Sequence, residues 1–432
     1  MKIGFLLLRS TYLKTMGSLI EASIKRGHQV TLLFTEEKSL DSKAYQRITE
    51  GTLAPLRALG AEATPFQLDE LGLIKEKFQL DILVTHEGYY SLHSYLEKIQ
   101  QARNKSVKIV SLAHFYETAK WPLESLDYFD KTYYLSQFAV DTHFRLNDNP
   151  SRQPIDNKYE GKYEAHGSPM LDQLIRVDRN EISKKLGIPM SKRVILFFAP
   201  SIVPETRWRY LWWRECSKIM RFLSLLKQRQ WKTLFWDGLF IPSLGQITEE
   251  LRRFCDRNGA FLIVKSRVKQ LDAKCLKEKA DLYLSGEEES YFPVFTSYEL
   301  LSIADLCISV MSMSAIEAVA ARVPVWNIYV PSTELDYPAS PLHPHQERYY
   351  EAIMRLGQEG PFDNPACITN IDPYEVIDWF RTKNLDNLKL DPEAAKAYAE
   401  KYLGVTKETS SARILDSLEK LHAQTKAAER PL

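Results

Sequence analysis

The sequence has few cysteines, and they are widely scattered. Five occur among 432 residues, and no pair has the spacing of a metal site. An odd and dispersed set is typical of reduced thiols, so we predict a cytoplasmic protein. The five are Cys216, Cys255, Cys275, Cys307 and Cys367.

Excess charge and long apolar runs are also missing. The chain carries 57 basic and 56 acidic residues, a net charge of +1, which gives no overall field to attract nucleic acid. No apolar stretch approaches the ~20 residues of a membrane span. The run Ile3–Leu8 lacks a cleavage site, so we expect no signal peptide. The length and 44% hydrophobic content suit two α/β domains of roughly 150–200 residues each.

The first predicted turn lacks the glycines of a dinucleotide-binding loop, which argues against a nicotinamide or flavin cofactor. It follows a strand and precedes a helix and a second strand, as in doubly wound folds. Such sheets bind ligands beyond the carboxyl ends of their strands, so Arg9, Ser10 and Thr11 are candidates to line a cleft. A plain turn with a helix cap is the alternative. The three predicted elements are Lys2–Leu8, Tyr12–Arg26 and Gln29–Phe34.

Polar side chains follow three later strands of the same predicted sheet. Histidine and glutamate at strand ends can serve as general bases, because burial and neighbours bring their pKa near neutral. We favour His114 because it directly follows the apolar run VKIVSLA. A lone histidine at a strand end is more often structural, so the prediction depends on the convergence of several such ends. The candidates are His86, Glu87, His114, Glu117 and Ser136.

A polar stretch between Asp148 and Glu164 is typical of an interdomain linker. A second α/β domain then has its first strand at Val194–Phe198, followed by a turn that contains Ser201. A later strand, Phe261–Val264, ends in Lys265-Ser266-Arg267, and two cations there suit a diphosphate. A solvated basic edge is the alternative. We predict domains at residues 1–165 and 166–385, with C-terminal helices at 386–432.

The most informative stretch is a strand–turn–helix–strand unit at Leu300–Pro331. Its turn places Ser312 and Ser314 at a helix N-terminus, where unpaired N–H groups and the helix dipole attract phosphate. Glu317 lies one turn further on, and its carboxylate could accept hydrogen bonds from the two hydroxyls of a ribose. The alternative, which the local pattern favours equally, is an ordinary capping box with Ser314 as the cap and Glu317 reaching back to the backbone N–H of Ser314.

Three further segments receive weaker predictions. The run Trp208–Arg214 could dock at a membrane surface, although core packing is the favoured interpretation. The acidic stretch Glu287–Ser290 is predicted to be a solvated loop. His343 and His345 flank a proline in a proline-rich loop, and we predict no metal site there.

Five segments resemble the GT-B superfamily, and in particular the branch of UDP-N-acetylglucosamine 2-epimerases, CDP-glycerol glycerophosphotransferases and Kdo-transferase-like enzymes of surface-polysaccharide synthesis. The resemblance spans most of the chain, and the serine–glutamate unit is its most specific part. The segments are LDILVTHEGYY (Leu80–Tyr90), IVSLAHFYE (Ile109–Glu117), HGSPMLDQL (His166–Leu174), ADLCISVMSMSAIEAVAARVPV (Ala304–Val325) and EKYLGVTKETSSARILDSL (Glu400–Leu418).

The resemblance implies two Rossmann-like domains with parallel sheets that face a central cleft, and C-terminal helices that cross back to the first domain. This sequence departs from the epimerase pattern, because Glu87 precedes the glycine and Met313 separates the two serines. It departs from the glycerophosphotransferase pattern, because Phe115 follows His114 and Lys265 stands where a His-Pro pair would be. The donor nucleotide therefore stays open.

These observations predict a metal-independent glycosyltransferase that moves a sugar from a nucleotide-sugar donor to a cell-surface glycan or lipid-linked acceptor. In this hypothesis Ser312, Ser314 and Ser201 hold phosphates, Lys265 and Arg267 offset their charge, and Glu317 holds the ribose. His114, Glu87 or His86 supplies the base. No cofactor and no metal is expected, and the protein is cytoplasmic or peripheral at the inner face of the membrane. Alternatives are a sugar-nucleotide 2-epimerase, a glycerophosphotransferase-like enzyme and a non-catalytic nucleotide-sugar-binding subunit.

Overall fold

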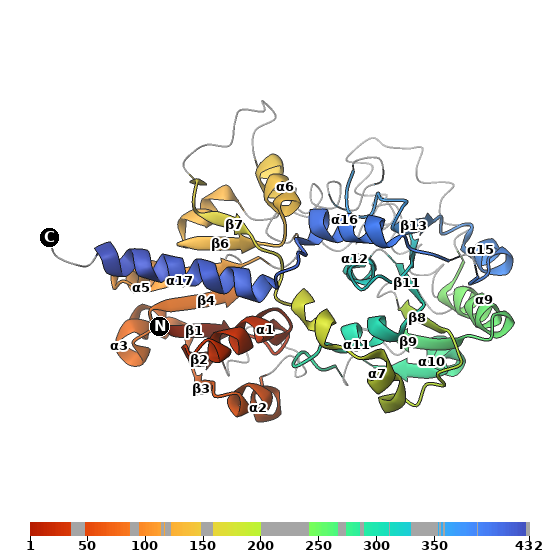
Figure 1. Ribbon diagram of the computed structural model, residues 1–432, viewed down its shortest axis with the longest axis horizontal. Coiled ribbons are helices and arrows are strands. Elements are labelled where there is room, and N and C mark those ends of the chain that lie inside the picture. The colour runs from red at the N-terminus through yellow and green to blue at the C-terminus, as the bar shows by residue number, and fades with distance from the viewer. Residues whose placement is uncertain are drawn as a thin grey trace, which may run out of the picture. The chain divides into compact units, whose positions relative to one another are not determined.

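The computed structural model describes residues 1–35, 48–86, 95–113, 116, 122–147, 159–199, 242–266, 274–285, 289–310, 312–329, 353, 356, 359–386 and 388–428. The chain divides into two units, and each contains one parallel β-sheet with helices packed on it (Figure 1). The predicted α/β class with Rossmann-like sheets is confirmed. The first unit is Met1–Arg176, Ser290–Thr296 and Ala397–Leu432; the second is Val177–Glu289 and Ser297–Lys396.

The first sheet has the strand order β3-β2-β1-β4-β5-β6-β7, and all its pairs are parallel. Strands β1 and β4 are apolar runs buried almost throughout, as expected where helices cover both faces of a sheet. The direction of winding reverses between β1 and β4. The strands are β1 (Lys2–Leu7), β2 (Gln29–Phe34), β3 (Glu62–Pro65), β4 (Ile82–His86), β5 (Lys108–Leu112), β6 (Lys131–Tyr134) and β7 (Tyr163–Ala165).

Residues 148–158 of the predicted linker lie outside the described residues, whereas its last two residues, Tyr163 and Glu164, belong to strand β7. Its three residues pair with β6 and complete the first sheet at that side. Glu164 on β7 pairs with Lys131 on β6 and with His166. These partners stabilise a strand whose polar sequence resembles that of a loop.

The C-terminal helix α17 (Ser410–Ala428) belongs to the first unit and packs on α1, as Figure 1 shows in blue and red. Its residues Ile414, Leu415 and Leu418 are part of the core of that unit. The prediction that C-terminal helices cross back to the first domain is confirmed. The unit's other helices are α1 (Tyr12–Lys25), α2 (Glu50–Ala58), η2 (Leu68–Leu73), α3 (Ile74–Phe78), α5 (Leu96–Asn104), η5 (Leu123–Asp127), α6 (Gln137–Asn147) and η7 (Leu171–Arg176).

The N-terminus of α17 is held by a carboxylate from elsewhere in the chain. Asp172 accepts hydrogen bonds from the backbone N–H groups of Ser410 and Ser411, at 2.9 and 2.8 Å. Burial raises the pKa of Asp172, and the hydrogen bonds from Ser411 and Ser410 oppose that shift. Close beside it, Gly167 and Gly404 touch backbone to backbone with positive φ angles of 82° and 62°, so neither has room for a side chain.

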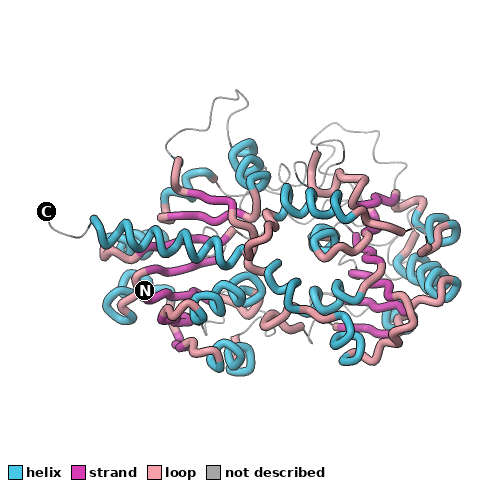
Figure 2. The backbone as a smooth tube through the Cα atoms, viewed as in Figure 1, coloured by secondary structure: helices cyan, strands magenta, loops and turns pink. Residues whose placement is uncertain are grey.

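The second sheet has the order β10-β9-β8-β11-β12-β13 and is also parallel. Its winding reverses between β8 and β11. Figure 2 shows its strands in magenta with helices in cyan around them. The strands are β8 (Val194–Phe198), β9 (Phe261–Lys265), β10 (Leu282–Leu284), β11 (Leu306–Val310), β12 (Val325–Ile328) and β13 (Ile368–Ile371); the helices are α7 (Arg179–Lys185), α9 (Leu244–Arg257), α10 (Lys274–Lys279), α11 (Thr296–Ile303), α12 (Met313–Ala320), α15 (Val376–Thr382) and α16 (Pro392–Leu403), which ends in the first unit.

A repeated aspartate motif builds the amino edges of the two sheets, where the strands begin. Each aspartate directly precedes a strand, and its carboxylate accepts the N–H of a residue near the start of the neighbouring strand. The aspartate's own N–H is donated to the carbonyl of that same residue. The four pairs are Asp81 with Lys2, Asp130 with Ile109, Asp281 with Leu262 and Asp305 with Val194, at carboxylate distances of 2.7–2.9 Å.

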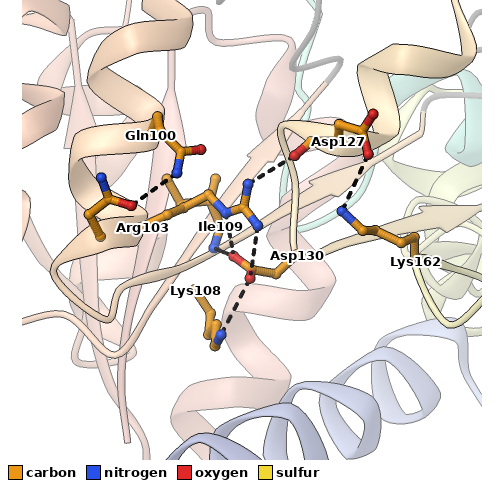
Figure 3. Close-up of polar contacts among 8 residues, drawn as sticks. Gln100, Arg103, Lys108, Ile109, Asp127, Asp130 and Lys162 are labelled. Atoms are coloured by element: carbon orange, nitrogen blue, oxygen red, sulfur yellow. Dashed lines mark hydrogen bonds and ion pairs between the residues drawn. The ribbon is translucent and has the colours of Figure 1, made fainter. Parts of the chain in front are cut away.

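Figure 3 shows one of these motifs, which is centred on Asp130. Arg103 and Lys108 both form ion pairs with its carboxylate, and Arg103 also donates to the Asp127 carbonyl. Lys162 in turn pairs with the Asp127 carboxylate. These charges are therefore used to fix the starts of β5 and β6.

Among the described helices of either unit, none is long and apolar enough to cross a membrane.

Candidate functional site

The β11–α12 connection lies where the winding of the second sheet reverses, at the carboxyl end of β11. Ser312 is the N-cap of α12, and its Oγ accepts from the Ser314 N–H at 3.4 Å and from the Ser314 hydroxyl at 2.9 Å. Ser314 Oγ lies 3.4 Å from Ser309 Oγ on β11. Both predicted phosphate ligands therefore stand at one helix N-terminus. The capping alternative differs from the structure, since the cap is Ser312 and not Ser314.

Glu317 lies one turn into α12 and is buried, with 3% of its surface exposed. Its Oε1 lies 3.4 Å from the hydroxyl of Tyr298, which belongs to α11. Cys307 on β11 is also near it: burial raises the pKa of the Cys307 thiol, and the negative charge of Glu317 adds to the rise. Sequence reasoning missed Tyr298. The signal that could have indicated such a partner is a glutamate among apolar helix residues, because a buried carboxylate requires hydrogen-bond donors nearby.

Lys265 ends β9 at the same edge of the second sheet. It is 5% exposed, and its Nζ forms an ion pair with Glu289 at 2.7 Å. The prediction that the Glu287–Ser290 stretch is a solvated loop is wrong for Glu289, because a buried lysine needs a counter-charge. The predicted phosphate contacts Ser201 and Arg267 lie outside the described residues.

His86 is the last residue of β4, next to the winding reversal of the first sheet. It is buried, and its ring lies 4.5 Å, centroid to centroid, from that of Tyr12 at the start of α1. Burial lowers the pKa of His86 to about 3, and the charges of Lys14 and Arg9 contribute. The imidazole is therefore neutral near pH 7 and weakly basic. The other two base candidates, His114 and Glu87, lie outside the described residues.

The remaining cleft candidates have different surroundings. The Oγ of Ser10 is buried and has no hydrogen-bond partner among the described residues. Thr11 is the N-cap of α1, but its side chain makes no capping hydrogen bond, and the Arg9 carbonyl accepts from the Tyr12 N–H. Ser136 donates to the Tyr402 carbonyl at 3.1 Å and accepts from the Ala139 N–H, a structural use. Glu117 lies outside the described residues.

Within the described part of the chain, no group of three histidine, cysteine, aspartate or glutamate side chains is arranged to hold a metal ion. The segments Trp208–Arg214 and His343–His345 lie outside that part.

No protein-family model and no curated protein sequence matches this chain. Solved structures do match. The UDP-N-acetylglucosamine 2-epimerase of Neisseria meningitidis bound to UDP-GlcNAc is 12% identical, with a TM-score of 0.53 over 97% of this chain and all 100% of that one. The epimerase of Methanocaldococcus jannaschii is 12% identical, with a TM-score of 0.52 over 97% and 100%. The wall teichoic acid polymerase TagF is 14% identical, with a TM-score of 0.55 over 99% and 90%.

At these identities the likeness concerns the fold. The chain has the GT-B fold that it shares with these epimerases and with the polymerase, as the sequence motifs predicted.

Proposed function

We propose that this protein is a GT-B glycosyltransferase that moves a sugar from a nucleotide-sugar donor to a cell-surface glycan acceptor without a metal ion. The observation that carries the proposal is the position of Ser312 and Ser314 at the N-terminus of α12, beside the winding reversal of the second sheet. Open parallel sheets bind their ligands at such a reversal, beyond the carboxyl ends of the strands.

The chemistry of this turn suits a nucleoside phosphate. The N-terminus of α12 directs backbone N–H groups and a positive dipole end toward an anion. The two hydroxyls add neutral donors, and Lys265 at the end of β9 adds a cation whose charge Glu289 partly offsets. Together these groups would stabilise the charge that develops on the leaving nucleotide.

The reaction also needs a base on the acceptor hydroxyl. As the hydroxyl oxygen bonds to the anomeric carbon, the bond from that carbon to the phosphate oxygen breaks, and the base receives the hydroxyl proton. Of the three candidates, His86 is disfavoured by its low pKa. We retain His114 as the first choice of base and Glu87 as the second.

His114→Ala should lower kcat while the donor affinity changes little. Near-normal turnover would exclude His114 as the base.

A thermal-shift screen tests the donor site. The protein is melted with UDP, CMP, CDP, GDP and their common sugar conjugates, with and without EDTA. A ligand at 100 times its Kd adds ~2.7 kcal/mol to the free energy of unfolding. Stabilisation by one nucleotide that is insensitive to EDTA supports the proposal.

A pair of variants makes this screen specific. Glu317→Gln should weaken the nucleotide shift. Glu250→Gln is the matched control, since Glu250 on α9 is also buried but pairs with Arg253 and Arg381. If no nucleotide shifts the wild type, or if both variants respond equally, the assigned donor site is wrong.

A second candidate function is sugar-nucleotide 2-epimerisation. The structural likeness to epimerases over 97% of this chain favours it. An epimerase converts its nucleotide sugar without an acceptor, whereas a transferase releases the nucleotide only when an acceptor is present. Incubation of the stabilising nucleotide sugar alone, followed by analysis of the sugar, separates the two.

A further inference from the structure

Tyr298 on α11 contacts the glutamate to which we assign ribose binding. The tyrosine is fully buried, and its hydroxyl is directed at Oε1 of Glu317 at 3.4 Å. Glu317 is itself shielded from water. Removing a carboxylate from water is costly unless hydrogen bonds replace the lost hydration, and a buried tyrosine hydroxyl also requires a partner. The Tyr298 hydroxyl supplies one such hydrogen bond to Glu317 across the α11–α12 contact.

The position of this contact distinguishes it from ordinary core pairing. Glu317 shares α12 with the two serines at the helix N-terminus, and all three residues are within six positions of each other in the chain. Tyr298 belongs to a different helix, α11, and its hydroxyl lies near Oε1 of Glu317, one turn into α12. It can therefore restrain that carboxylate oxygen from outside the helix that carries the serines.

We propose that Tyr298 is a positioning residue that makes the donor site select ribonucleotides over 2′-deoxyribonucleotides. Oε1 accepts from Tyr298, and the carboxylate is thereby oriented to accept from the 2′- and 3′-hydroxyls of a ribose. Each carboxylate oxygen has two acceptor positions, so the three bonds are compatible. This inference rests on the proposed function.

Selectivity follows from the cost of an unpaired buried group. A site built to accept from a substrate hydroxyl rejects the analogue that lacks it, because the carboxylate is then left without that donor. If Glu317 can rotate freely, a water or another donor replaces the missing hydroxyl and the selectivity falls. The orientation set by Tyr298 prevents that rotation.

The test compares dissociation constants for UDP, CDP, CMP and GDP with those for their 2′-deoxy counterparts. We expect the wild type to prefer the ribose form at least about tenfold, as for one lost buried hydrogen bond. Tyr298→Phe keeps the ring and should reduce the preference to about threefold or less. Tyr133→Phe is the matched control, because it removes another buried hydroxyl, bonded to Ser417 in the first unit, and should leave the preference intact.

A double variant excludes a merely structural effect. In the Glu317→Gln background, adding Tyr298→Phe should change the ribose preference no further, because the hydroxyl acts through the carboxylate. A Tyr298→Phe protein that binds nucleotides with the wild-type preference overturns the inference while the proposed function stands. A wild type that binds no nucleotide overturns both.

Discussion

The two edges of each sheet use polar side chains in different ways. At the amino edges, Asp130 and Asp305 each exchange two hydrogen bonds with a neighbouring strand and also pair with a cation. At the carboxyl edges, the hydroxyls of Ser312 and Ser314 bond to each other at a helix N-terminus, and the Oγ of Ser10 has no partner among the described residues.

This contrast indicates which edge of each sheet is available for chemistry. An aspartate whose carboxylate is committed to backbone and to arginine fixes the strand starts and gives little to a ligand. Hydroxyls and N–H groups at a helix start remain suited to an incoming anion. Changes at the amino edges should therefore alter stability alone, whereas changes at the carboxyl edges should alter ligand binding.

We expect the largest change in stability at Lys265. This residue lies at a carboxyl edge, so it tests whether the amino and carboxyl edges differ in what they contribute to stability. Lys265→Ala removes the cation that pairs with Glu289, whose side chain is only 13% exposed, so the second unit should lose about 3 kcal/mol of unfolding free energy. Urea unfolding measures the loss. The double variant Lys265→Met with Glu289→Leu should recover much of it, because no charge is left unpaired. A single variant as stable as the wild type would show that the pair is not buried in solution.

Asp130 tests the amino edge. Asp130→Ala removes the acceptor for the Ile109 N–H and the partner of Arg103 and Lys108, and should cost about 2 kcal/mol. The nucleotide-induced shift of the melting temperature should be the same as in the wild type. A weaker nucleotide shift in this variant would contradict the separation of the two edges.

His86 should make the first unit sensitive to mild acid. Its pKa is lowered from 6.5 to about 3 by burial and by the charges of Lys14 and Arg9. The unfolded chain therefore binds a proton below pH 6.5 that the folded chain does not, so stability falls as the pH drops from 6.5 toward 3. We expect a loss of about 1 kcal/mol between pH 7 and pH 5.5 from this group.

Unfolding curves at several pH values check this expectation. His86→Phe keeps an aromatic ring beside Tyr12 but cannot bind the proton. The variant should show a shallower fall in stability between pH 7 and pH 5.5. An unchanged pH dependence would mean that the imidazole is reached by water.

The smallest expected effect concerns two helix caps. Ser312→Ala and Thr49→Ala each remove the side-chain acceptor at a helix start, α12 in the second unit and α2 in the first, and should each cost roughly 0.5–1 kcal/mol. Only Ser312→Ala should weaken the nucleotide shift. Equal nucleotide-induced shifts in the two variants would mean that Ser312 only caps the helix and does not bind the nucleotide.

Much of the fold follows from local pattern. Four predicted apolar strands agree with the structure to within one residue: Lys2–Leu8 with β1, Gln29–Phe34 with β2, Val194–Phe198 with β8 and Phe261–Val264 with β9. Two kinds of element did not. Strand β7 is too short and polar to show a period of two, and the four-residue β13 was not among the predicted strands. Both are recognised only by their pairing with a neighbour.

Local sequence pattern was enough to predict an α/β protein in which a serine pair, followed by a glutamate, stands at the start of a helix. These features depend on residues close together in the chain, whose periodicity and helix-start chemistry are local. The partners of the buried charges became known only from the folded chain: Glu289 for Lys265, Tyr298 for Glu317 and the serines of α17 for Asp172. A buried charge needs a partner, but its choice depends on which distant segments pack together.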